Sequence, residues 1–172
     1  LRIVAKNLGC RVIGSVGSDD KAQWLLDECS VDEVINYKTC GDLTEALTKA
    51  APDGVDVYFE NVGGEHLQAA LNVMNHFGRI AACGMIATYN NSKPAPGPNN
   101  LMLIVGKKIR INGFIVFDHN DMRTQFLSDM ESWVSEGKIK TKETIVEGLD
   151  NAVDAFLALF TGDNFGKMIV KI

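Results

Sequence analysis

The sequence lacks the features that mark nucleic-acid-binding and membrane-spanning proteins. Its 172 residues carry 17 Lys and Arg against 22 Asp and Glu, with no basic run, so a nucleic-acid or anionic-membrane surface has little electrostatic support. Apolar runs such as residues 101–105 are far shorter than the roughly 20 residues that cross a bilayer. No charged-then-apolar signal opens the chain. We therefore expect a cytoplasmic protein with no nucleic-acid partner and no membrane partner.

Cysteine and proline are also scarce. Cys10, Cys29, Cys40 and Cys83 stand singly, with no Cys-x-x-Cys pair and no neighbouring His, so neither a disulfide framework nor a zinc site is expected. We expect four buried thiols instead. Three of the four prolines fall within residues 85–100, which predicts a long loop there.

The residues that are present indicate a globular α/β fold. With 46% hydrophobic and 23% charged residues, the chain has ample material for a core. Strand-like apolar runs alternate with helical patterns, which predicts a doubly wound parallel sheet, Rossmann-like, with right-handed crossovers. The expected strands are 11–16, 32–36, 55–59, 78–83, 109–117, 143–146 and 167–171. The expected helices are 19–29, 42–51, 64–75, 101–105, 120–137 and 151–160, after the end of a helix at 1–8.

In an open parallel sheet, ligands bind beyond the carboxyl ends of the strands. The strand 55–59 ends in Glu60-Asn61, followed by Val and two glycines. The glycines let the backbone approach a ligand closely, and Asn61 offers both a donor and an acceptor. An ordinary turn and helix start would explain the same residues, so the motif by itself leaves both interpretations open.

A second strand end carries Gly17, Ser18 and Lys21 at the start of a helix, which outlines an anion site. In dinucleotide folds, an acidic residue at this position holds a free ribose 2′-hydroxyl, whereas small residues beside a cation admit a 2′-phosphate. Asp19 and Asp20 could hold a ribose, but we expect them to cap the helix. The pattern therefore favours a phosphate.

Six motifs in chain order resemble those of the zinc-independent medium-chain dehydrogenase/reductases, in the prostaglandin reductase and leukotriene dehydrogenase branch that includes alkenal double-bond reductases. The resemblance runs from end to end of the chain. The motifs lie at residues 14–21, 36–38, 58–64, 83–90, 113–116 and 164–167.

The resemblance implies that NADPH reduces a carbon-carbon double bond conjugated to a ketone or aldehyde, with no metal. It places Lys21 and Tyr37 at the 2′-phosphate region, Asn61 at the ribose-phosphate portion, and Asn164 against the cofactor from the chain's end. The implied nicotinamide side comprises Cys83, Gly84, Met85, Ile86, Tyr89, Phe114, Ile115 and Val116.

The family pattern also has parts that this sequence does not show. The glycine-rich phosphate loop, the first strand of the sheet and the amino-terminal catalytic domain would all precede Leu1, so we expect a truncated sequence. The expected organisation is a partial dinucleotide-binding domain at 1–118 and a helix-strand-helix-strand segment at 119–172 that completes the subunit.

For catalysis we select Tyr89, because a phenol after a strand end can hydrogen-bond the nicotinamide ribose or the substrate oxygen. Tyrosines in such loops also simply pack, and that alternative stays open. His66, His76 and His119 are expected at the surface or at helix ends. Two other functions also stay open: a catalytically silent nucleotide-binding module, and a methyltransferase.

The apolar strand expected at 109–117 would lie at a sheet edge, with Arg110 as its only charge and no proline. Natural proteins rarely leave such an edge unpaired in water. A second copy could pair with it across a two-fold axis, which predicts a homodimer. A loop or the helix after Asn120 covering the edge would instead leave a monomer.

Overall fold

The computed structural model describes residues 2–172, so Leu1 lies outside the described residues. The chain divides into two compact units, Leu1–Asn36 with Leu127–Ile172, and Tyr37–Phe126. Both contain helices and parallel strand pairs, as the predicted Rossmann-like α/β class requires. The division at residue 118 stays a proposal.

The first unit holds two parallel strand pairs. β1 pairs with β2, with Ile13 opposite Glu33, and β6 pairs with β7, with Glu143 opposite Lys167. Its core is built from the buried residues Val12, Val16, Leu25, Cys29 and Val31. The elements are α1 (Arg2–Asn7), β1 (Ile13–Val16), α2 (Asp19–Asp27), β2 (Glu33–Asn36), β6 (Glu143–Glu147), η3 (Leu149–Asn151), α7 (Ala152–Thr161) and β7 (Lys167–Lys171), and α6 (Arg123–Ser135) begins at the end of the second unit.

Two side-chain contacts join distant segments within this unit. Asp32 accepts hydrogen bonds from the Lys6 ammonium at 2.8 Å and from the Val12 amide at 2.7 Å. These bonds, the one from Lys6 first, lower the pKa of Asp32 below its ordinary value. Trp24 of α2 meets the ring of Phe165 edge to face, with centroids 5.8 Å apart, so the two ends of the chain share one packed region.

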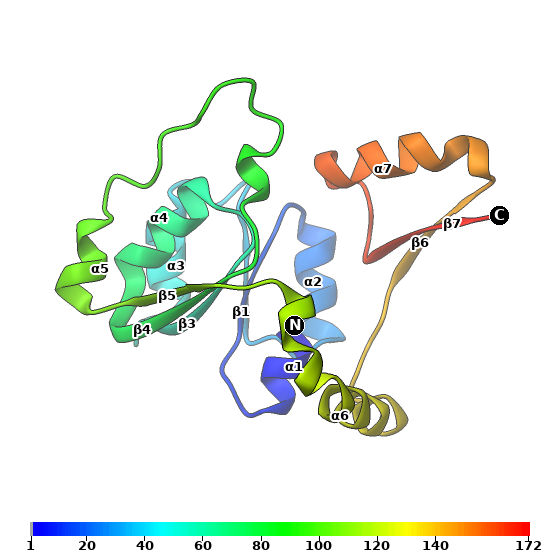
Figure 1. Ribbon diagram of the computed structural model, residues 1–172, viewed down its shortest axis with the longest axis horizontal. Helices are drawn as coiled ribbons and strands as arrows, with labels where there is room; N and C mark the ends of the chain where they lie inside the picture. The colour runs from blue at the N-terminus through cyan, green and yellow to red at the C-terminus, as the bar shows by residue number, and fades with distance from the viewer. Residues whose placement is uncertain (1) are drawn as a thin grey trace. The chain divides into compact units, whose positions relative to one another are not determined.

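The second unit is a three-stranded parallel sheet in the order β3-β4-β5. Figure 1 shows α3 and α4 side by side, and the Asn72 amide of α4 donates to the Thr44 hydroxyl of α3 at 3.3 Å. The core contains Leu67, Leu71, Met74, Ile80 and Ile109. The elements are α3 (Leu43–Ala50), β3 (Val55–Glu60), α4 (Gly64–Val73), β4 (Met74–Ala82), η1 (Ile86–Thr88), α5 (Met102–Lys107), β5 (Arg110–Gly113) and η2 (Val116–Met122).

The prediction of a strand over 109–117 was wrong beyond Gly113. In the β4–β5 ladder, Gly113 stands opposite Ala82, which is the last residue of β4. Since no further partner residue follows in β4, the chain leaves the sheet and enters the 3-10 helix η2. The helix expected from 120 therefore starts as 3-10 turns and becomes α-helical at Arg123.

The helix expected to reach Asn75 ends at Val73, and β4 starts directly after it. The Asn75 amide donates to the Asp53 carbonyl at 3.0 Å and to the Asp56 carboxylate at 2.8 Å, and these bonds hold the residue in the sheet. A register irregularity in the β3–β4 ladder accommodates the extra residues.

Two local expectations also need correction. Of the four cysteines, only Cys29 is buried, whereas Cys10 and Cys83 are exposed and Cys40 is intermediate. Burial raises the pKa of the Cys29 thiol. The cap of α2 is Ser18, because its hydroxyl accepts from the Lys21 amide at 3.4 Å, and the two aspartates lie in the first turn.

No helix within residues 2–172 combines the length and apolar character that crossing a membrane requires.

Candidate functional site

The candidate site in the second unit is built from the segments that follow β3 and β4. Backbone hydrogen bonds join these segments directly. The Ile86 amide donates to the Asn61 carbonyl at 3.0 Å, and the Ala87 amide donates to the Val62 carbonyl at 2.9 Å. The two strand ends predicted to bind a ligand thus form one continuous surface, with the Asn61 side chain exposed on it.

Two glycines lie where these segments meet. Gly63 has φ of 77°, and a Cβ there would lie 3.0 Å from the Cβ of Met85. A Cβ on Gly84 would come within 2.8 Å of the Tyr89 hydroxyl and 3.7 Å of the Asn61 side-chain oxygen. A side chain at either position would therefore press against Met85 or Tyr89, so the glycines let the two segments pack closely.

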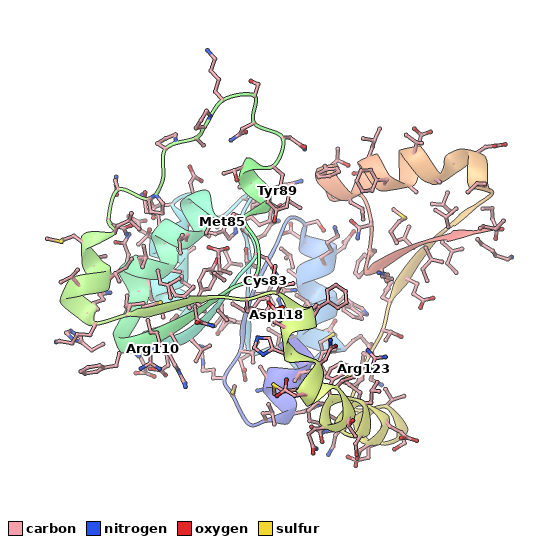
Figure 2. All side chains as sticks on the ribbon, viewed as in Figure 1. Cys83, Met85, Tyr89, Arg110, Asp118 and Arg123 are labelled. Atoms are coloured by element: carbon pink, nitrogen blue, oxygen red, sulfur yellow. The ribbon has the colours of Figure 1, made fainter. Side chains whose placement is uncertain are left out.

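Tyr89 follows η1 and presents its phenol beside the end of β4. Its oxygen accepts a hydrogen bond from the Met85 amide at 3.2 Å, and 62% of the residue is exposed. Figure 2 shows Cys83, Met85 and Tyr89 along this one segment. The bond to Met85 uses a lone pair of the phenol and not its proton, so the hydroxyl can still donate to a ligand.

Sequence reasoning assigned no role to Glu60, the last residue of β3. This carboxylate is fully buried, and its Oε1 accepts from the Gly63 amide at 2.8 Å and from the Tyr58 hydroxyl at 3.2 Å. Burial first, and the nearby Glu60 charge second, raise the pKa of Tyr58 well above its ordinary value. The available signal was an acidic residue standing at the end of an apolar strand.

Phe114, Ile115 and Val116 follow β5. The Phe114 amide donates to the Ala82 carbonyl at 3.2 Å, and its ring meets Phe59 with centroids 5.9 Å apart. Ile115 and Val116 are 60% and 65% exposed. This predicted part of the site thus begins where β4 and β5 end.

Tyr37 lies after β2 and meets the ring of His66 edge to face, with centroids 5.1 Å apart. His66 belongs to the first turn of α4, so the expectation of a helix-end position is correct. Burial lowers the pKa of His66, which favours the neutral imidazole. Tyr37, 43% exposed, offers an aromatic surface at the helix start.

In the first unit, Gly17 and Ser18 connect β1 to α2, as the sequence predicted. The Lys21 ammonium donates to the Gly162 carbonyl at 2.5 Å. Gly162 ends α7 in a left-handed conformation with φ of 78°. The lysine predicted to bind a phosphate thus already has a carbonyl partner near the end of α7.

Asn164 lies two residues beyond that carbonyl. Its side-chain amide donates to the Gly166 carbonyl at 2.7 Å. In this structure the residue shapes the turn that leads into β7, so the contact that the resemblance implies, with a cofactor, stays a prediction.

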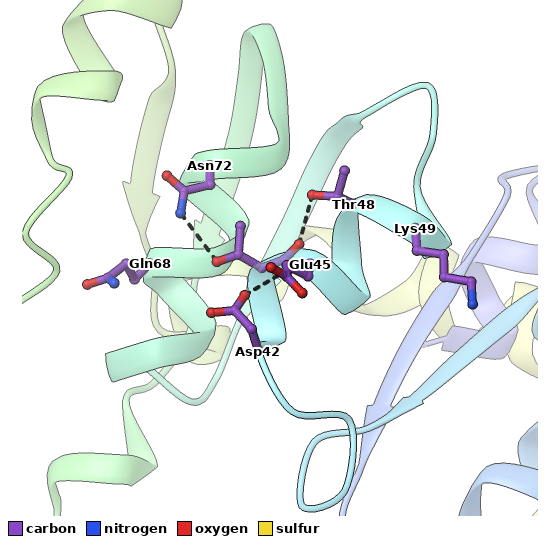
Figure 3. A pocket seen from close by; sticks show the side chains of 7 residues that line it. Asp42, Glu45, Thr48, Lys49, Gln68 and Asn72 are labelled. Carbon is purple, nitrogen blue, oxygen red and sulfur yellow. Dashed lines mark hydrogen bonds between the residues drawn. The ribbon is translucent and has the colours of Figure 1, made fainter.

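A shallow hollow of about 610 Å³ lies along α3 and α4, as Figure 3 shows. It shares no residue with the predicted site. Its polar groups serve the helices: Asp42 caps α3 by accepting from the Glu45 amide at 2.8 Å, and the Thr48 hydroxyl donates to the Thr44 carbonyl at 2.7 Å. The exposed Asn61 and the Tyr89 phenol lie instead at the strand ends.

The parallel strand-helix units, with glycines and polar groups at the strand ends, define a dinucleotide-binding type of α/β fold. Residues 3–132 match the family described as zinc-binding dehydrogenase. The chain belongs to this medium-chain dehydrogenase/reductase family, in the branch of the prostaglandin reductases, which sets the methyltransferase alternative aside.

Individual proteins support the same branch. Prostaglandin reductase 1 of Bos taurus is 46% identical over 98% of this chain and 51% of the relative. The NADP(+)-dependent 2-alkenal reductase of Nicotiana tabacum is 43% identical over 98% of this chain and 49% of the relative. The structure of CurA in complex with NADPH from Vibrio vulnificus superposes with a TM-score of 0.92 at 39% identity, over 99% of this chain and 52% of that chain.

The chain therefore spans about half the length of the proteins that it resembles. Among residues 2–172, no group of three or more His, Cys, Asp or Glu side chains comes together as a metal site.

Proposed function

We propose that this chain carries the NADPH-binding part of an enzyme that reduces the carbon-carbon double bond of α,β-unsaturated ketones or aldehydes. The observation that carries the proposal is the joined surface after β3 and β4, where the exposed Asn61 and the exposed Tyr89 phenol lie together. The likeness to an NADP-dependent 2-alkenal reductase and to an NADPH complex supports the choice of cofactor and substrate class.

The proposed cofactor contacts follow the elements. In the first unit, Gly17, Ser18 and Lys21 bind the 2′-phosphate, and Asn164 adds a contact near the end of the chain. In the second unit, Tyr37 contacts the 2′-phosphate region and Asn61 binds the ribose-phosphate portion. The proposed nicotinamide contacts are Cys83, Gly84, Met85, Ile86, Tyr89, Phe114, Ile115 and Val116.

The structure offers a fit for an anionic cofactor. Gly63 precedes the ten-residue helix α4 and provides no side-chain acceptor for the first-turn amides, so an anion can contact the amino terminus of the helix. When bound, NADPH supplies the hydride. The Tyr89 hydroxyl donates to the substrate oxygen as negative charge develops there, which stabilises the enolate before its α-carbon is protonated.

The direct test is turnover of NADPH by the whole protein with a simple 2-alkenal or enone. The loss of reduced-nicotinamide absorbance measures this turnover. The matched saturated aldehyde or ketone should give no turnover, because it has no conjugated double bond. NADPH binding without turnover of any enone or enal would favour the silent nucleotide-binding module.

Replacing Tyr89 by Phe should lower kcat with an enone about tenfold and leave the Kd for NADPH nearly unchanged, because the lost hydrogen bond acts on the developing charge. Steady-state kinetics together with a fluorescence titration of NADPH measure the two effects separately. Equal kcat in parent and variant would reduce Tyr89 to a packing role.

We also propose a cytoplasmic homodimer that pairs through β5. All four cysteines are free thiols, which suits a reducing compartment. β5 uses one edge for β4, and Ile111, 41% exposed, lies in the middle of the strand. The shorter strand still offers backbone groups for pairing between copies.

Light scattering of the whole protein should give a dimer, and Ile111→Pro should shift it towards monomer, because proline removes an N–H group and restricts the backbone. Ile111→Ala keeps the N–H group and should stay dimeric. A monomeric parent refutes the dimer, and a dimeric proline variant places the interface elsewhere.

A further inference from the structure

Glu60 gathers three donors on one buried oxygen. Its Oε1 accepts from the amides of Val62 and Gly63 and from the hydroxyl of Tyr58, and the residue has no solvent exposure. All three donors lie within three residues of Glu60. The side chain therefore folds back onto the turn that follows its own strand and fixes the path of that turn from the inside.

The main chain of the same residue holds the neighbouring segment. The Glu60 carbonyl accepts from the Cys83 amide at 2.9 Å and from the Gly84 amide at 3.2 Å. Side chain and carbonyl together thus tie the ends of β3 and β4 to a single residue.

One oxygen of the Glu60 carboxylate lowers the stability of the fold. The second carboxylate oxygen, Oε2, is buried and has no hydrogen-bond partner among residues 2–172. A buried acceptor without a partner costs free energy, because no hydrogen bond offsets its desolvation. The Glu60 carboxylate acts instead on the geometry of the turn, because it holds the amide of Gly63. Gly63 has φ of 77° and ψ of −161°, a conformation outside the common regions.

We propose that Glu60 is a positioning residue for the cofactor surface: its carboxylate sets the Val62 and Gly63 backbone so that Asn61 and the start of α4 face the ligand. The inference rests on the proposed function for the identity of the ligand. It predicts that affinity for the cofactor decreases from Glu to Gln to Leu at position 60, because the hydrogen-bond acceptor first becomes weaker and is then lost.

The experiment compares the whole protein with its Glu60→Gln and Glu60→Leu variants, by fluorescence titration of NADPH and by thermal unfolding. Gln keeps an acceptor oxygen without the charge, so we expect a Kd about threefold higher. Leu removes the acceptor, so we expect a Kd about tenfold higher, together with a lower melting temperature because the Val62 and Gly63 amides lose their partner.

Asp42→Ala is the matched control in the same unit. It removes a carboxylate that caps α3, so the melting temperature should fall while the Kd for NADPH stays within about twofold of the parent. Equal Kd values for the parent and Glu60→Leu would overturn the proposal, as would an equal loss of affinity in the Asp42 control.

Amide hydrogen exchange in Glu60→Gln tests the proposal without the cofactor. It also does not require the Glu60→Leu variant to fold. In Glu60→Gln, the amides of Val62 and Gly63 should exchange about threefold to tenfold faster than in the parent, because a neutral oxygen accepts more weakly. Unchanged exchange overturns the positioning role. If the parent binds no NADPH but exchange in Glu60→Gln is faster as expected, the proposed function is overturned. The role of Glu60 in positioning the turn is then retained.

Discussion

Replacing Leu71 by Ala is expected to lower the free energy of unfolding by about 2–5 kcal/mol. Leu71 has no exposed surface and packs with Met74 and Ile80 between α4 and the sheet of the second unit. Truncation removes buried methyl groups and leaves a cavity, because helix and sheet can close only part of the space. Urea unfolding of the protein measures the loss.

Leu101→Ala is the matched control, because it makes the same chemical change in the same unit at a residue that is 48% exposed. Its effect should stay below about 1 kcal/mol, since much of its apolar area is already in contact with water. Similar losses for the two variants would contradict the position of Leu71 at the centre of this core.

The fold class could be predicted because its signals are local. The alternation of apolar strands with amphipathic helices needs only neighbouring residues, and parallel pairing follows from it. The start of α3 was predictable for the same reason. Asp42 stands before a helical pattern, and its carboxylate caps the Glu45 amide three residues later, as the structure confirms.

The end of β5 could not be predicted, because it depends on a distant strand. All four residues at 114–117 are β-branched or aromatic, so strand propensity continues past Gly113. The ladder stops because β4 ends at Ala82, and the sequence of β5 does not indicate where β4 ends. Phe117, 77% exposed, shows that propensity without a pairing partner does not make a strand.

The positions of the candidate residues at the strand ends could be predicted, but the contacts between them could not. Strand ends and glycines indicated where a ligand could approach, and Asn61 and Tyr89 lie on that surface. The sequence did not show that Glu60 turns back to bind two amides, because an acidic residue at a strand end more often faces solvent. Nor did it show that Lys21 has a carbonyl partner 141 residues away.

Replacing Lys21 by Ala is expected to raise the Kd for NADPH about tenfold to a hundredfold and to change the Kd for NADH little, so the preference between the cofactors should shrink by the same factor. The ammonium donates to the Gly162 carbonyl, a neutral acceptor. A 2′-phosphate carries about two negative charges and three acceptor oxygens, so it competes effectively for a flexible lysine. Fluorescence titrations at one ionic strength, with both cofactors, measure the ratio.

Lys21→Met separates the phosphate contact from a purely structural one, because it keeps most of the aliphatic side chain and removes the charge. If Lys21 binds the 2′-phosphate, Met and Ala should lose NADPH affinity equally and both should keep NADH affinity. If Lys21 only bonds to the carbonyl at the end of α7, both substitutions should raise the Kd for NADPH and the Kd for NADH by the same factor. The 2′-phosphate would then take no part in the loss. Only the first pattern retains Lys21 as the residue that selects NADPH over NADH.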